Sequence, residues 1–229
     1  CNISPARPEP LDLEEPKHVA EAVKELGLKF AVITSVTRDD LPDGGAQHFK
    51  NCIDEIRKIC DAKVEILTPD FKDDKRALDT VIKAHPDVFN HNIETVRSIF
   101  KTARPQGDYD RSIEVLRYVK ENSNIVTKSG LMVGLGATHV DIGSADNRKT
   151  TCLSCNSESA SMYSSELEEI EQTLVDLKNA GVDIVTIGQY IQPSKQHLPV
   201  AKYYTLEEFE ELKELARKIG FKNFQIGPL

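Results

Sequence analysis

The stretch KFAVITSVTRDDLPDGGAQHF, residues 29–49, contains the pattern that decides the fold. It opens with an apolar, β-branched run over residues 29–36, which is typical of a buried strand. A polar loop follows and ends in the glycine pair 44–45, where the missing Cβ atoms let backbone amides approach a ligand closely. From Phe49 onward, apolar residues recur three and four positions apart, which predicts a helix. Strand, loop and helix together form one unit of a parallel α/β sheet.

The same unit recurs along the chain. Each further strand candidate is short and apolar, and the segments between them carry helical stripes of apolar residues. One such stripe, Val19, Ala22, Val23 and Leu26, precedes the first strand and ends at Gly27. The alternation predicts a barrel or partial barrel of parallel strands. The further strands are expected at residues 63–68, 88–93, 126–135, 183–187 and 223–226.

The composition favours one soluble domain in a reducing compartment. A chain of 229 residues with 39% hydrophobic residues can bury one sizeable core. It has no apolar run long enough for a membrane span and no secretory leader, and its net charge of −8 disfavours binding to nucleic acid. Cys52 and Cys60 lie on the apolar face of a helical pattern, so we expect core thiols rather than disulfides. Cys1 and the terminal run 227–229 suggest that both ends of the chain are cut.

Residues 137–165 interrupt the alternation. This segment has no apolar period and is rich in serine, so we expect a disordered insertion within a single barrel domain that spans residues 1–229. An unspliced intron or an assembly error explains it better than a genuine loop. Cys152 and Cys155 have a spacing suited to iron or zinc, but a serine-rich loop would not preorganise them, so we do not expect a metal site there.

Polar residues gather where the predicted strands end. Because the carboxyl ends of barrel strands meet at one rim, such residues are expected to converge on one site. For the loop after the first strand alone, a capped turn is an equally good explanation. Four such strand ends in a row favour a binding site, since burying polar groups is costly unless something is bound. These residues include Asp39 and Asp40, then Asn90, His91, Asn92 and Glu94, then Lys128 and Gly134, and finally Gln189 and His197.

The same runs resemble the lipoyl synthase family of the radical S-adenosylmethionine (SAM) superfamily. The resemblance covers nearly the whole chain outside the insertion. It implies a partial (βα)6 TIM-type barrel whose first strand is missing here, two 4Fe-4S clusters, and SAM as cofactor. The implied activity is sulfur insertion at C6 and C8 of a protein-bound octanoyl group, which is a sulfurtransferase reaction giving the lipoyl cofactor. The matching runs are TSVTRDDLPDGGAQHF (34–49), LTPDF (67–71), VFNHNIETV (88–96), TKSGLMVGLG (127–136), TIGQYIQPSKQHLPV (186–200) and GPL (227–229).

Roles for individual residues follow from that resemblance. Cys1 is similar to the third cysteine of the family's C-x3-C-x2-C triad, which implies a cluster ligand. The loop 34–45 and the stretch 92–94 should face SAM, and residues 130–134 should pack near its adenine. Weaker candidates on the rim include Arg104. The implied SAM-binding residues are Ser35, Asp39, Asp40, Asn92, Glu94, Lys128, Gly134 and Gln189.

The chain also departs from the family pattern. The first two triad cysteines, the auxiliary-cluster cysteines and a C-terminal Arg-Ser-Ser-Tyr are absent, and Ala137 replaces a glutamate, so this fragment is expected to be inactive alone. The resemblance implies octanoylated lipoyl carrier domains as partners, namely 2-oxoacid dehydrogenase E2 subunits and the glycine cleavage H protein. A ferredoxin or flavodoxin would donate electrons. We expect a cytoplasmic location, or a mitochondrial or plastid one in a eukaryote, and no nucleic-acid or membrane partner. A noncatalytic binding relative, or another sulfur-inserting radical SAM enzyme such as a biotin synthase relative, remain alternatives.

Overall fold

A computed structural model describes the backbone of residues 8–135 and 158–228, and the side chains of the same ranges except 158–165. Within these ranges, six parallel strands form one sheet in the order in which they occur along the chain. The first and last strands are its two edges, so the sheet is an open, partial barrel, as predicted. The strands are β1 (Phe30–Thr34), β2 (Lys63–Leu67), β3 (Val88–Asn90), β4 (Val126–Val133), β5 (Ile184–Gln189) and β6 (Asn223–Ile226).

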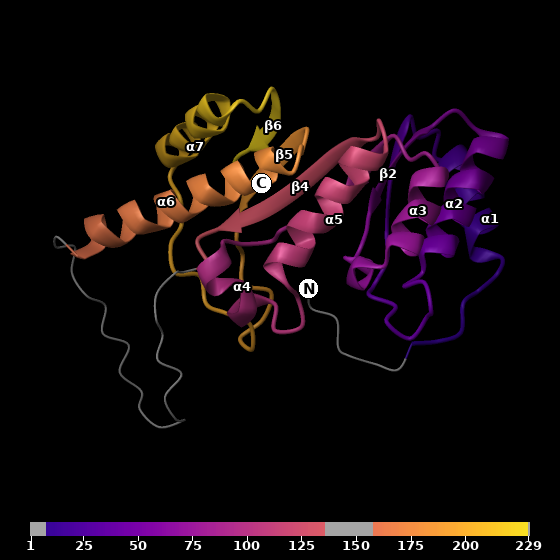
Figure 1. The fold of residues 1–229 in the computed structure, drawn as a ribbon, viewed down its shortest axis with the longest axis horizontal. Coiled ribbons are helices and arrows are strands. Elements are labelled where there is room, and N and C mark those ends of the chain that lie inside the picture. The colour runs from indigo at the N-terminus through magenta and orange to yellow at the C-terminus, as the bar shows by residue number, and fades with distance from the viewer. Residues whose placement is uncertain (1–7, 136–157, 229) are drawn as a thin grey trace.

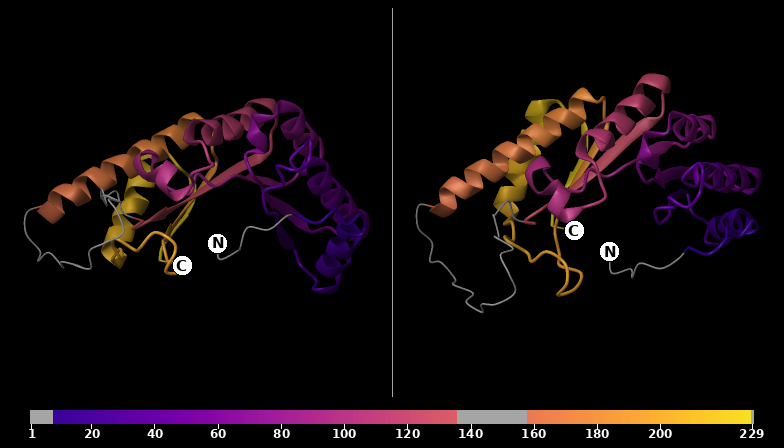
Figure 2. Two further views of the ribbon diagram at one scale, coloured as in Figure 1. Left: turned by 90° about the horizontal axis from the view of Figure 1, so that it is seen from below. Right: turned by 60° about the horizontal axis from the view of Figure 1, so that its bottom comes forward.

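Helices follow the strands and lie on the outside of the arch that the sheet forms (Figures 1 and 2). Local signals set their ends. Thr205 and Glu208 form a capping box at the start of the helix that ends before Gly220, and Asp74 and Asp108 each accept a hydrogen bond from a backbone amide at a helix start. The helices are α1 (Glu15–Glu25), α2 (Ala46–Ile59), α3 (Lys75–Lys83), α4 (Arg97–Ala103), α5 (Tyr109–Asn122), α6 (Glu158–Asn179) and α7 (Leu206–Ile219), with a short 3-10 turn η1 (Phe71–Asp73).

The hydrophobic core lies between the outer face of the sheet and these helices. Ile66 of β2 and Phe89 of β3 are fully buried there, as are Leu78, Leu116 and other helical side chains. Burying one such side chain contributes roughly 1.5–3 kcal/mol. Because side chains alternate across a strand, the residues between these buried positions must point to the inner, concave face.

The structure shortens several expected strands and corrects one helical stripe. β1 covers residues 30–34 and β3 only residues 88–90, because the chain turns away at His91. Val23 is buried in α1 as predicted, but Ala22 is exposed and Leu26 is 71% exposed. The reason is that α1 packs mainly on α2 at the open end of the sheet and so buries only a narrow face.

The predicted insertion falls only in part on described residues. α6 begins at Glu158, so residues 158–165 are helical, whereas residues 137–157 lie outside the described ranges. Among the helices that the structure describes, none is long and apolar enough to cross a membrane.

Candidate functional site

The inner face of the sheet carries polar side chains among apolar ones, although the interior of a barrel is ordinarily filled with branched apolar side chains. The strand register places Glu65 of β2 beside Val32 and Val88, and Asn90 of β3 beside Lys128 of β4. These polar residues alternate with the buried outer-face positions, so they belong to the concave side. A polar inner face needs internal partners or a ligand to offset its desolvation.

A buried ion pair joins two of these strands. The carboxylate of Glu65 is 4% exposed, and its two oxygens accept hydrogen bonds from Lys128 Nζ at 2.9 and 3.2 Å. Asn90 Nδ2 donates to the same carboxylate over 2.8 Å. The Lys128 side chain is 23% exposed, whereas that of Glu65 is almost fully buried. The sequence predicts Lys128 as a SAM contact but not Glu65, which the structure shows as its ion-pair partner.

The turn after β3 brings Asn92 and Glu94 to the same region. Glu94 has a φ of +69°, a left-handed conformation that is uncommon for a residue with a side chain and that often marks functional sites. It is held there because its amide donates to the Gly130 carbonyl at 2.9 Å and its own carbonyl accepts from Met132 at 2.8 Å. Burial raises the pKa of the Glu94 carboxyl above its ordinary value, although nearby Arg104 opposes this shift.

Gly130 makes room for this arrangement. A Cβ atom at this position would lie 2.6 Å from Thr186 Oγ1 and 3.0 Å from Asn92 Oδ1. The first contact is closer than real Cβ atoms come and the second is unusually tight, so glycine lets the side chains of Thr186 and Asn92 approach β4 without shifting. Gly130 thus contacts the Asn92–Glu94 stretch, while the predicted packing of residues 130–134 near the SAM adenine stays a prediction.

Gly134 and Gln189 hold the segment that follows β5. Gly134 has a φ of +83°, and its carbonyl accepts from the Ala201 amide at 2.9 Å. Gln189 Nε2 donates to the Lys202 carbonyl at 2.9 Å, and Gln189 Oε1 accepts from the Tyr204 amide at 2.9 Å. The Gln189 side chain therefore fixes a loop over the carboxyl end of β5, and a contact with SAM stays a prediction.

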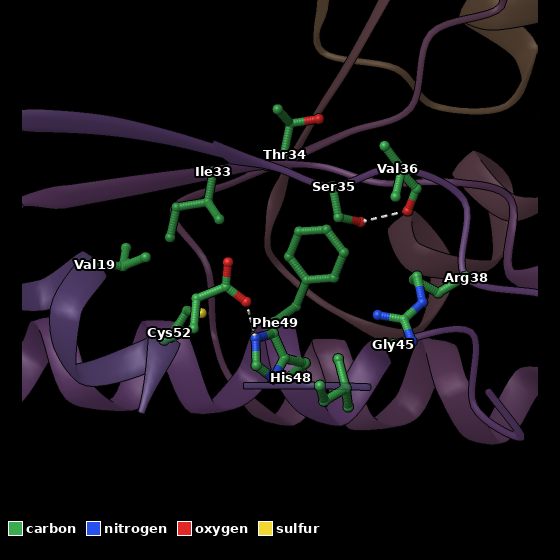
Figure 3. A pocket seen from close by; sticks show the side chains of 12 residues that line it. Val19, Ile33, Thr34, Ser35, Val36, Arg38, Gly45, His48, Phe49 and Cys52 are labelled. Carbon is green, nitrogen blue, oxygen red and sulfur yellow. Dashed lines mark hydrogen bonds and ion pairs between the residues drawn. The ribbon is translucent and has the colours of Figure 1, made fainter. Parts of the chain in front are cut away.

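Ser35 lies elsewhere. It lines a hollow of about 240 Å³ between α1, α2 and the end of β1, on the outer side of the sheet (Figure 3). Its hydroxyl donates to the Val36 carbonyl at 3.0 Å, while His48 and Glu15 face each other across 2.7 Å on the same wall. The structure therefore does not bring Ser35 together with the inner-face residues.

Asp39 and Asp40 form local pairs at the rim. Asp40 accepts two hydrogen bonds from Arg38, at 2.9 and 2.8 Å, and this bonding lowers the pKa of its carboxyl. Asp39 lies 3.4 Å from Lys72 and lines an open hollow of about 550 Å³ that also includes Arg104. Both aspartates are exposed, so the loop 34–45 is stabilised by contacts with its immediate surroundings.

His91 is buried on the outer side of the same turn. Its Nδ1 lies 2.9 Å from the Thr68 carbonyl, and burial lowers the pKa of the imidazole, so Nδ1 carries the proton and donates it to that carbonyl. His197, the other histidine singled out in the sequence, lies 2.8 Å from Ser194 Oγ through its Nδ1. Both histidines therefore support local backbone structure.

The cysteines divide into described and undescribed positions. Cys52 is buried, and burial raises the pKa of its thiol to about 11, while Cys60 is a free thiol whose Sγ approaches the Ile56 carbonyl. The prediction of packed thiols is confirmed for Cys52. Cys1, Cys152 and Cys155 lie outside the described ranges, and no group of metal-ligating side chains occurs within them.

Sequence reasoning missed Glu65 altogether. It lies in the middle of the run KVEIL, where the apolar neighbours gave the strand and the acidic residue was passed over. The available signal was a lone charge inside an otherwise buried strand, since such charges are rare unless they are paired.

Comparison with known proteins agrees with this geometry. A model of the radical SAM superfamily matches residues 1–148. The lipoyl synthase of Rubrobacter xylanophilus is 48% identical to the whole chain, which spans 63% of that protein. The lipoyl synthase of Caldanaerobacter subterraneus subsp. tengcongensis is 44% identical to the whole chain, which spans 71% of it. The chain thus covers less than two thirds of the first of these relatives.

Solved structures show the same fold at low sequence identity. The hydrogenase maturase HydG superposes with a TM-score of 0.65 at 14% identity, over 96% of this chain and 45% of that one. Methylornithine synthase gives a TM-score of 0.58 at 12% identity, over 94% of this chain and 62% of that one. Given the superfamily match and whole-chain identities well above those of the fold relatives, the chain belongs to the lipoyl synthase family of the radical SAM superfamily.

Proposed function

We propose that the protein is a lipoyl synthase, which replaces hydrogen by sulfur at C6 and C8 of an octanoyl group on a carrier lysine. The observation that carries this proposal is the identity of 44–48% along the whole chain to enzymes of that name. The inner-face residues support it, because a strained turn, a buried carboxyl and a required glycine converge on one place. The described residues form the sheet and the candidate site, and the activity belongs to the complete natural protein.

The hydrogen-bonding groups of this site suit SAM. Its ribose hydroxyls and amino group need acceptors, which Asn92 and Glu94 offer beside Gly130. Gly134 and Gln189 hold the loop after β5 against the same end of the sheet. Asp39 and Asp40 would contact the cofactor only from the neighbouring rim, and the position of Ser35 on the outer side of the sheet argues against the contact expected for it. When bound, SAM and a 4Fe-4S cluster supply the radical chemistry that an unactivated C–H bond requires.

The clusters depend on residues beyond those described. Cys1 is the proposed ligand of the first 4Fe-4S cluster, and a second cluster is proposed as the sulfur source. The described residues do not offer a thiolate set, so their part is to bind SAM and to shape the site. We further propose a cytoplasmic location, or an organelle in a eukaryote. The proposed carriers are lipoyl domains of 2-oxoacid dehydrogenase E2 subunits and the glycine cleavage H protein, with a ferredoxin or flavodoxin as electron donor.

The test is anaerobic reconstitution of the complete natural protein. Iron and labile sulfide are counted, and 5′-deoxyadenosine is measured with an octanoylated carrier peptide. About eight irons per chain, as two 4Fe-4S clusters require, with deoxyadenosine formed would support the proposal. Absence of clusters and of SAM cleavage would overturn it and would leave a noncatalytic relative that binds the carrier.

A further inference from the structure

The ion pair on the inner face leaves hydrogen-bonding capacity that the described contacts do not use. Lys128 carries three N–H donors, and Glu65 accepts from it at two oxygens, 2.9 and 3.2 Å away. Because the pair is neutral as a unit, the third N–H donor of Lys128, whose side chain is 23% exposed, is available on the inner face without an excess charge.

Asn90 supplies an unused acceptor next to it. Its Nδ2 is committed to Glu65 at 2.8 Å, which fixes the orientation of the amide. Its Oδ1 is buried and has no hydrogen-bond partner among the described residues, although Asn90 is only 6% exposed. Leaving a buried acceptor unpaired is unfavourable, so a group that donates to it would be favoured.

These two groups lie next to the proposed SAM site. Asn90 and Lys128 are register partners on β3 and β4. Two residues further along β4, Gly130 accepts from the Glu94 amide, and Asn92 approaches the same glycine. The donor and the acceptor therefore belong to the same concave surface as the Asn92–Glu94 turn.

We propose that Lys128 and Asn90 form a subsite that binds the amide joining the acyl chain to the carrier lysine. Lys128 Nζ donates to the amide carbonyl, and Asn90 Oδ1 accepts from the amide N–H. Glu65 is the positioning residue, since it orients both partners. A neutral amide suits this subsite because the Glu65–Lys128 pair has no net charge to select a carboxylate or an ammonium group. The inference rests on the proposed function for its substrate.

The test compares two octanoylated peptides. In one, the acyl group is attached to lysine through the natural amide, and in the other an ester oxygen replaces the amide N–H. Dissociation constants are measured for the complete, cluster-loaded protein, together with that for SAM. The double variant Glu65→Leu/Lys128→Met removes the subsite without leaving a buried charge, since apolar replacement of both partners is often tolerated. Lys63→Met is the matched control. Lys63 lies on β2, the strand that carries Glu65, but it forms its ion pair with Asp87.

We expect wild type and Lys63→Met to bind the amide peptide about tenfold more tightly than the ester, the size of one buried hydrogen bond. The double variant should lose this preference, whereas Lys63→Met should keep it. The subsite proposal would be wrong if wild type and the double variant preferred the amide peptide equally, or if wild type showed no preference. Lys128 and Asn90 would then form hydrogen bonds with water and not with the substrate amide. If wild type bound octanoylated and unmodified peptides equally, the proposed function would fail as well, which separates the two failures.

Discussion

The loop after β1 and the inner face of β2 to β4 carry equally dense polar residues, yet they are built in different ways. In the loop, Asp40 pairs with Arg38 two residues away, and Asp39 lies near the exposed side chain of Lys72. On the inner face, Glu65, Asn90 and Lys128 come from three strands and are joined by hydrogen bonds to a carboxylate that is 4% exposed. The difference shows that polar residues in a sequence do not by themselves distinguish an exposed loop from a buried network. Removing one partner should cost more stability in the buried network than in the loop.

Lys128→Met should cause the largest effect. It leaves the Glu65 carboxylate buried without its cation, which costs about 3 kcal/mol, the lower end for a buried pair because Lys128 is partly exposed. Urea denaturation measures this free energy of unfolding. Recovery of most of the loss in Glu65→Leu/Lys128→Met would confirm that the unpaired charge is the cause, and a single variant as stable as wild type would contradict the network.

Gly130→Ala should cause the second-largest loss of stability. The added Cβ would lie 2.6 Å from Thr186 Oγ1, and overpacking of this kind costs about 1–3 kcal/mol. Gly188→Ala is the control, since no atom lies within 4 Å of its Cβ position on the neighbouring strand. Thermal unfolding of both variants is compared with wild type. Equal melting temperatures for the two variants would mean that the Asn92 and Thr186 side chains do not crowd Gly130.

Glu94→Gln should increase stability at neutral pH. Burial raises the folded-state pKa of Glu94 above the ordinary value of 4.5, so wild type loses stability as the pH rises through that folded pKa and the carboxyl ionises. The variant lacks this loss, and its advantage in melting temperature should shrink as the pH is lowered to about 4.5. An advantage that did not depend on pH would contradict the assignment. The same variant should bind SAM more weakly if Glu94 accepts from the cofactor.

Asp40→Asn should have the smallest effect. Asp40 is exposed and its partner Arg38 only half-buried, and ion pairs at the surface contribute little to stability. We expect no measurable change in melting temperature at physiological salt. A loss of stability as large as that of Lys128→Met would show that the loop also depends on its ion pairs. The two regions would then not differ.

Much of the fold could be predicted because apolar periodicity records which face each element buries. All six strands occur where the apolar runs indicated, with ends displaced by a few residues. The sequence also placed Asn92, Glu94, Gly134 and Gln189 at or just after strand ends, where the structure has them, whereas Lys128 lies inside β4; contacts of these residues with SAM stay predictions. Glu65 was missed because its importance depends on Lys128, which is 63 residues away and meets it only across β3. The exposure of Leu26 was missed because a helical stripe does not indicate how many neighbours the helix has.

We propose that this chain belongs to an enzyme that makes lipoyl groups at the inner face of the β3 to β5 region. The decisive experiment is mass spectrometry of an octanoylated carrier peptide that has been incubated anaerobically with the complete cluster-loaded protein, SAM and a reductant. We expect a product in which two sulfur atoms replace two hydrogens, formed by wild type and Lys63→Met and in lower yield by Glu94→Gln. A fully cluster-loaded wild-type protein that leaves the octanoyl group unchanged would contradict it.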